Sequence, residues 1–83
     1  MPRGLNNWSY KDVIGFLRDS GFEFFEERKG SHEAWIRKDV NGKEFVVEVN
    51  FKQGGKAYST LTLLTMIGQS GVDKKEWRKW ASN

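Results

Sequence analysis

The chain has 83 residues, with 14 Lys and Arg against 11 Asp and Glu, so its formal net charge is +3 when its one histidine is neutral. A chain of this length buries only about 60% of the surface that its unfolded form exposes, which allows one small core and excludes a large two-lobed cofactor enzyme. It contains no cysteine, which excludes a disulfide framework, a zinc finger and a thiol nucleophile. Aromatic residues make up 14% of the chain, so we expect an aromatic-rich core.

No stretch approaches the roughly 18 consecutive apolar residues of a membrane helix, and the N-terminus lacks the apolar segment of a secretory signal. We therefore expect a cytoplasmic protein that does not bind membranes. No internal repeat or long linker divides the chain. The predicted organisation is a flexible arm over residues 1–8 and a single domain over residues 9–83.

The first predicted element is an amphipathic helix that begins after Ser9. The Ser9 side chain can cap the amide three residues later, and Asp12 suits the first turn of a helix. Gly21 is placed to end the helix in a left-handed conformation. Between them, apolar residues recur at helical spacing, at Tyr10, Val13, Ile14 and Leu17.

Three strands are predicted next, over residues 22–28, 32–38 and 43–51, because these runs are rich in aromatic and β-branched residues. Asn41-Gly42, between the second and third runs, favours a hairpin with a type I′ turn, since both residues tolerate positive φ. Alternation along the third strand gives it one apolar face, made of Phe45, Val47, Val49 and Phe51. We therefore expect one face of the sheet to be buried.

Two more helices complete the prediction. One is expected from near Thr62 to Ser70, and Asp73 begins a short last helix that carries Trp77 and Trp80 on the core side. The predicted fold is α+β, in the order α-β-β-β-α with a terminal helical extension and a three-stranded antiparallel sheet.

Two motifs in the chain resemble the HicA (YcfA-like) toxins of HicAB toxin–antitoxin systems. One is Lys-Gly-Ser-His at 29–32, and the other is Thr-Leu-x-x-x-Ile-x-Gln-x-Gly-Val at 62–72. The resemblance spans residues 9–80. It implies a fold like that of double-stranded-RNA-binding domains (dsRBD-like), with helices on one face of the sheet. It also implies an mRNA interferase, an endoribonuclease with an essential histidine at His32 that a HicB-like antitoxin protein neutralises.

The residue types also fit ribonuclease chemistry without the family. RNA supplies its own nucleophile, the 2′-OH, so a metal-free ribonuclease needs only a proton acceptor, a proton donor and cationic groups near the phosphate. His32 is the candidate general acid/base, because imidazole has an ordinary pKa of about 6.5. No small-molecule cofactor is expected, and no spacing of acidic residues suggests a metal site.

The candidate RNA-binding residues lie beside this histidine or in a polar, glycine-containing loop expected over residues 52–60. Gly30 allows close approach of the backbone to a ligand, and the Ser31 amide and hydroxyl can donate to a phosphate oxygen. The others are cationic. The full set is Arg28, Lys29, Gly30, Ser31, Lys52 and Lys56.

One histidine cannot both remove and deliver the protons of the reaction in a full cycle. A second proton-transfer group is therefore required. The sequence leaves it open between Tyr58, Lys52, Lys56 and water.

Other interpretations remain open. Alternation places His32 on the same strand face as Ala34 and Ile36, where it could be an ordinary core residue, or at the rim of the sheet. Trp35 lies on the opposite face and, if exposed, could stack an unpaired base or anchor a protein. The alternative functions are a non-catalytic RNA-binding module of dsRBD-like fold and a protein-interaction domain.

Overall fold

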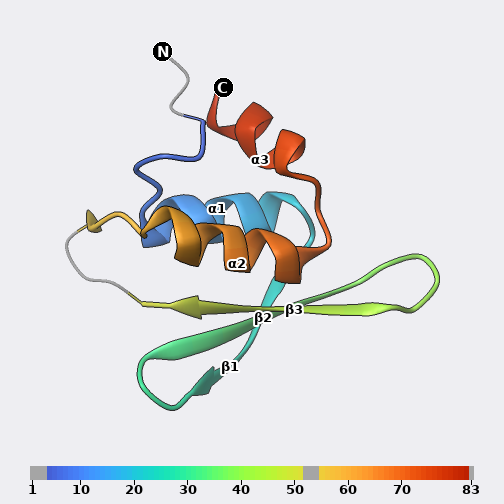
Figure 1. Ribbon diagram of the computed structural model, residues 1–83. Helices are drawn as coiled ribbons and strands as arrows, with labels where there is room; N and C mark the ends of the chain where they lie inside the picture. Colours follow the sequence, from blue (N-terminus) through green and yellow to red (C-terminus); the bar gives the residue numbers. More distant parts are fainter. Residues whose placement is uncertain (1–3, 52–54, 83) are drawn as a thin grey trace.

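A computed structural model of the protein describes residues 4–51 and 55–82 (Figure 1). The strands form one antiparallel sheet in the order β1-β2-β3, and α1 and α2 lie on the same side of it (Figure 1). The predicted α+β fold is therefore confirmed. Within the described ranges, no helix is both long and apolar enough to cross a membrane. The elements are α1 (Tyr10–Asp19), β1 (Glu23–Arg28), β2 (His32–Lys38), β3 (Glu44–Asn50), α2 (Thr60–Ser70) and α3 (Lys74–Ala81).

The first helix begins as its sequence predicts, with a reciprocal capping box. The Asp12 amide donates to the Ser9 hydroxyl (3.4 Å), and the Ser9 amide donates to the Asp12 carboxylate (2.9 Å). These bonds satisfy backbone donors that a helix start leaves without partners. Gly21, at φ 91°, follows the last turn.

The second helix begins two residues earlier than expected, at Thr60. Ser59 has an extended backbone and accepts a hydrogen bond from the Thr62 amide (3.2 Å), so Ser59 is the N-cap. The helix ends as predicted before Gly71, which is left-handed at φ 71°. A local cap therefore extends the start of the helix to residues of weak helix propensity.

The hairpin between β2 and β3 forms at the expected place with a different turn. The Gly42 amide donates to the Asp39 carbonyl (3.0 Å), the Asp39 amide donates to the Lys43 carbonyl (2.9 Å), and Gly42 has φ 80°. Asn41 is not among the described residues with positive φ, whereas a type I′ turn requires positive φ at both central residues. The type I′ prediction is therefore wrong. The Asp39 carboxylate, which accepts from the Asn41 and Lys43 amides, stabilises the wider turn instead.

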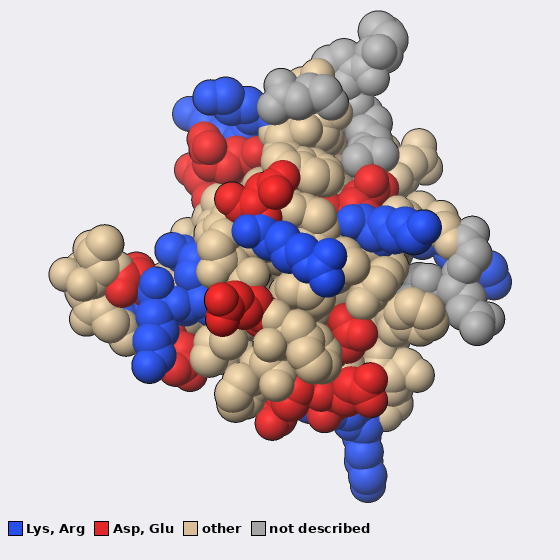
Figure 2. Space-filling model, turned by 180° about the vertical axis from the view of Figure 1, so that it is seen from behind, with Lys and Arg blue, Asp and Glu red and all other residues tan. Residues whose placement is uncertain are grey.

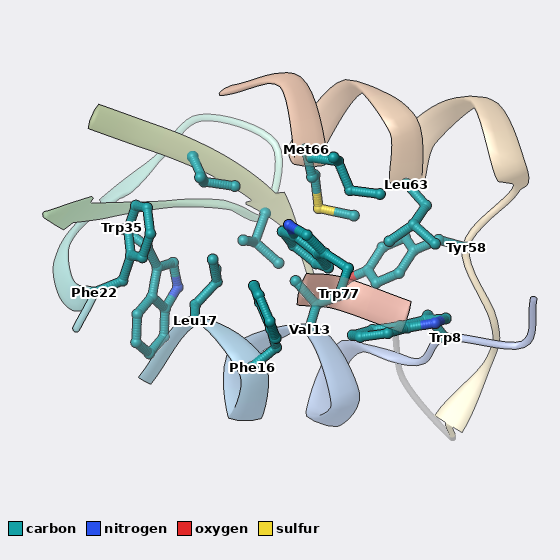
Figure 3. Packing of buried hydrophobic residues seen from close by; sticks show 13 residues of the cluster. Trp8, Val13, Phe16, Leu17, Phe22, Trp35, Tyr58, Leu63, Met66 and Trp77 are labelled. Carbon is teal, nitrogen blue, oxygen red and sulfur yellow. The ribbon is translucent and has the colours of Figure 1, made fainter. Parts of the chain in front are cut away.

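The helices bury one face of the sheet (Figure 3). Trp35 and Val47 are cross-strand partners on this face, and both are buried. Val49 is buried beside them, whereas Phe51 at the end of the expected apolar stripe stays 43% exposed. Because Trp35 is in the core and its Nε1 donates to Glu33 (3.1 Å), it is not an exposed ring for base stacking or for a protein partner.

A cluster of aromatic rings joins α3 to α1. The Trp77 ring stacks on Phe16 at a centroid distance of 4.1 Å, and Trp8 packs against both rings. Trp80 is partly buried and its Nε1 donates to Asp19 (2.8 Å). These contacts confirm that Trp77 and Trp80 pack on the core.

The last residue of the expected flexible arm belongs to the packed domain. Trp8 is fully buried, and its carbonyl accepts from the Tyr58 amide (2.8 Å). Ser9 forms an isolated antiparallel bridge with Ala57. The boundary predicted at residues 8 and 9 is therefore wrong at Trp8, because burial of a large indole outweighs the polarity of the residues before it.

Gly68, inside α2, and Gly71, directly after its last residue, should respond in opposite ways to substitution by alanine. In Gly68→Ala the new methyl group meets no atom within 4 Å, so the variant should be more stable by about 0.5–1 kcal/mol through higher helix propensity. In Gly71→Ala the methyl group overlaps the Phe45 ring, and φ is 71°, so the free energy of unfolding should fall by more than about 1 kcal/mol. Urea unfolding measures both changes, and changes of the same sign would contradict this packing.

Candidate active site at the end of the sheet

A three-residue turn places His32 at the start of β2. The turn, residues 29–31, joins β1 to β2 so that Arg28 and His32 are cross-strand partners. Gly30 and Ser31 are both left-handed, at φ 74° and 64°, a conformation that costs a non-glycine residue about 1–2 kcal/mol. The Ser31 carbonyl accepts from the Phe51 amide (2.9 Å), which ties the turn to the end of β3.

His32 lies on the sheet face that points away from the core. Its partners in the ladder are Arg28 on β1 and Asn50 on β3, and residues directly opposite in a sheet share a face. The imidazole side chain is 39% exposed. Of the two alternatives left by the sequence, the rim position is therefore confirmed.

A carboxylate links the histidine to an arginine. Glu48 has one oxygen 3.7 Å from His32 Nδ1 and the other 3.6 Å from a guanidinium nitrogen of Arg28. Arg28 Nε also bonds Glu26 (3.2 Å). Because Arg28 belongs to β1 and Glu48 to β3, the guanidinium group reaches across β2.

The two nitrogens of the imidazole have different surroundings. Nδ1 is buried and has no hydrogen-bond partner among the described residues, and a Glu48 carboxylate oxygen lies 3.7 Å from it. A methyl group at Gly30 would lie 3.5 Å from Cδ2 and 3.9 Å from Nε2. The turn backbone therefore packs against the Cδ2 side of the ring, and Nε2, unlike Nδ1, is not among the buried side-chain atoms without a partner.

Two open hollows meet at this ring. The first, the turn hollow, has a volume of about 400 Å³ and is lined by Glu27, Arg28, Ser31, His32, Glu33 and Phe51. The second, the helix hollow, has a volume of about 330 Å³ and is lined by His32, Glu48, Asn50, Thr62, Thr65, Met66 and Gln69. Both are in the size range of sites for small ligands or single nucleotides, and His32 is the residue that they share.

Part of the predicted RNA-binding set is brought together with the histidine. Arg28 and Ser31 line the turn hollow with it, and Gly30 packs against the ring. All are fixed by the β1–β2 turn, so local sequence is enough to assemble them.

The two predicted lysines that the structure describes are not brought into the site. Lys29 is exposed in the turn and lines neither hollow. Lys56 is also exposed and lines neither hollow, and Lys52 lies outside the described residues.

Several residues of the site were missed from the sequence. Glu48 and Asn50 alternate with buried valines on β3, so the register of the hairpin would have placed them beside β2. Thr65 and Gln69 belong to α2, and no local pattern in the sequence indicates that this helix lies beside His32. Tertiary packing alone brings them there.

The tyrosines are poor proton-transfer groups near neutral pH. The Tyr58 hydroxyl donates to the Asn50 carbonyl, and burial raises the pKa of this phenol far above its ordinary value. Burial, and then a hydrogen bond to Glu33 (2.7 Å), raise the pKa of Tyr10 to about 12. Tyr58 is therefore unsuited to be the second acid/base group.

The charges around the site are mixed. Glu27 and Glu33 line the turn hollow together with Arg28. On the face seen in Figure 2, Lys and Arg side chains alternate with Asp and Glu and do not form one basic surface. Among residues 4–51 and 55–82, no three His, Cys, Asp or Glu side chains gather as a metal site would require.

Comparison with protein-family models, with curated proteins and with solved structures finds no match to this chain. The function is therefore inferred from the geometry of the site.

The raised pKa of Tyr10 predicts a loss of stability in alkali. An unfolded tyrosine ionises near pH 10, whereas folded Tyr10 stays protonated up to about 12, so rising pH favours the unfolded chain across this window. The free energy of unfolding should fall from about pH 10 upward, and less steeply in Tyr10→Phe. Urea unfolding of both proteins over this range measures the difference, and parallel curves would contradict the assigned environment of Tyr10.

The contact between Glu48 and His32 predicts which nitrogen carries the proton of the neutral imidazole. A carboxylate beside Nδ1 favours the Nδ1–H form. Nitrogen-15 NMR of the imidazole should therefore show Nδ1–H in the wild type and a shift toward Nε2–H in Glu48→Gln. Glu44→Gln, the same change at the other end of β3, is the control, and an unchanged tautomer in Glu48→Gln would refute the contact.

Proposed function

We propose that the protein is a metal-independent endoribonuclease of the HicA toxin type, with mRNA as its substrate and His32 as its general acid/base. The observation that carries the proposal is the position of His32, whose Nδ1 lies beside Glu48 and which lines two open hollows. The resemblance of residues 29–32 and 62–72 to HicA motifs supports the same function.

In the proposed reaction, the RNA 2′-OH attacks the adjacent phosphorus, so that an O2′–P bond forms and the P–O5′ bond breaks. His32 Nε2 takes the 2′-OH proton, and the Glu48 carboxylate stabilises the imidazolium ion through Nδ1–H. Water delivers a proton to the leaving 5′-oxygen, since Tyr58 holds its own proton too tightly. General base catalysis of this kind contributes roughly 10²- to 10⁴-fold in rate.

The turn hollow supplies groups that suit the phosphate and a neighbouring base. Arg28 offers guanidinium donors, and Ser31, which lines the same hollow, offers a hydroxyl. The exposed ring of Phe51 offers a face on which an unpaired base can stack. Together they favour a single-stranded RNA with its scissile phosphate at His32.

The same proposal includes a HicB-like antitoxin that covers the site. This partner follows from the HicA resemblance. Leu61 and Leu64 on α2 are 76% and 37% exposed, and they flank Thr62 and Thr65 of the helix hollow in the sequence. Such apolar surface beside a polar site is typical of protein interfaces.

Loss of the imidazole should abolish cleavage. With a long single-stranded RNA in EDTA, His32→Ala is expected to cut at least about 100-fold more slowly than wild type. Lys56→Ala, which changes an exposed residue outside both hollows, should cut at the wild-type rate. An RNA with a 2′-deoxy group at the cut nucleotide should resist the wild-type enzyme.

Circular dichroism must first show that each variant is folded. Equal cleavage by wild type and His32→Ala would contradict the assignment of His32. Salt-dependent RNA binding by a wild-type protein that does not cut would favour the non-catalytic RNA-binding module, and neither binding nor cleavage would favour the protein-interaction domain.

A further inference from the structure

The helix hollow differs in chemistry from the turn hollow, although His32 lines both. None of the described residues that line it is a lysine or an arginine, and its polar side chains are those of His32, Glu48, Asn50, Thr62, Thr65 and Gln69. Amide and hydroxyl side chains can hydrogen-bond the edges of bases, whereas a phosphate is bound most strongly by cationic groups and is repelled by a carboxylate such as that of Glu48. The lining therefore suits an unpaired base better than a phosphate.

Gln69 is held in one orientation before any ligand binds. Its Oε1 accepts from the Glu48 backbone amide (3.0 Å), which lies at the outer edge of β3. Because the donor is a backbone N–H, the oxygen must face the strand and the NH₂ group must face away from it. No described residue accepts a hydrogen bond from this NH₂ group, so it is a double donor available to a ligand in the hollow.

Thr65 contributes an acceptor to the same hollow. Its hydroxyl donates to the Leu61 carbonyl one turn earlier (3.0 Å), which uses its proton and leaves oxygen lone pairs free. Thr65 and Gln69 are four residues apart on α2 and therefore lie on one face of the helix. A fixed donor beside a fixed acceptor is a preorganised site for the edge of a nucleobase.

We propose that the helix hollow is a base-recognition subsite, in which Gln69 and Thr65 bind one unpaired base of the RNA next to the cleaved phosphate and so set the cleavage preference. This inference rests on the proposed ribonuclease function, because the position of the base is defined by the phosphate at His32. Because His32 lines both hollows, an RNA with its scissile phosphate at the imidazole can place a neighbouring base in the helix hollow.

The test compares cleavage sites in a pool of random-sequence RNA, in EDTA, by sequencing the product ends. Gln69→Glu keeps an acceptor for the Glu48 amide and replaces the side-chain NH₂ donor with a second acceptor. Thr65→Val removes the side-chain hydroxyl. Each variant should change the base preference at one position beside the cut by about 5- to 10-fold, the worth of one or two base contacts.

Two variants of Gly68 control for stability and charge. Gly68 is the neighbour of Gln69, is exposed and lies outside the hollow. Gly68→Ala controls for a change in helix stability, and Gly68→Glu adds the same charge as Gln69→Glu without facing the hollow. Both Gly68 variants should keep the wild-type base preference beside the cut, even where their cleavage rates differ from that of the wild type.

If wild type cuts and the Gln69 and Thr65 variants cut with unchanged preference, the subsite is refuted while the ribonuclease stands. If wild type does not cut, the ribonuclease fails, and NMR tests the subsite alone with four short RNAs that differ in one base. The Gln69 side-chain NH₂ signals should then shift by amounts that depend on that base. Signals that do not move with any of the four RNAs would overturn the proposal.

Discussion

Burial of one face of the sheet under α1 and α2 is the constraint on which the site depends. Trp35, Val47 and Val49 must all point toward the helices to be buried, and alternation along β2 and β3 then sends the residues between them to the other face. His32 and Glu48 lie on that other face. A slip of one residue in the register would exchange the two sets, so the packing of the core also determines the geometry of the candidate site.

The ion pairs on that outer face determine the positions of side chains more than they contribute to the free energy of folding. The side chains of Arg28, Glu26, Glu48 and His32 are between 39% and 50% exposed, and exposed pairs contribute little to the free energy of folding. Ala34, between Glu26 and Glu48 in the ladder, is nevertheless fully buried. The small side chain leaves room for Arg28 to reach across β2, and this bridge holds Glu48 where it faces His32.

Stability and the candidate chemistry are located at different places in the domain. Without disulfides, the chain relies on aromatic packing, in which Phe16 stacks on Trp77 and both contact Trp8. This packing joins α3 to α1 on the side of the helices away from the sheet (Figure 1). The turn over residues 29–31, with left-handed Gly30 and Ser31, lies at an end of the sheet. This turn is not part of the core, so packing elsewhere in the domain offsets the strain of its backbone.

The sequence by itself determined the elements, their order and the position of the histidine. Periodicity, the Ser9 cap and the hairpin signal are local, and so is the turn that joins Arg28 to His32. Only the tertiary structure decided that Trp8 is buried, that Trp35 is in the core rather than at the surface, and that Glu48 faces the imidazole. It also brought Thr65 and Gln69 beside His32. Hydrogen bonding and turn chemistry act between near neighbours and can be read along the chain, whereas burial depends on which surfaces meet after the chain has folded.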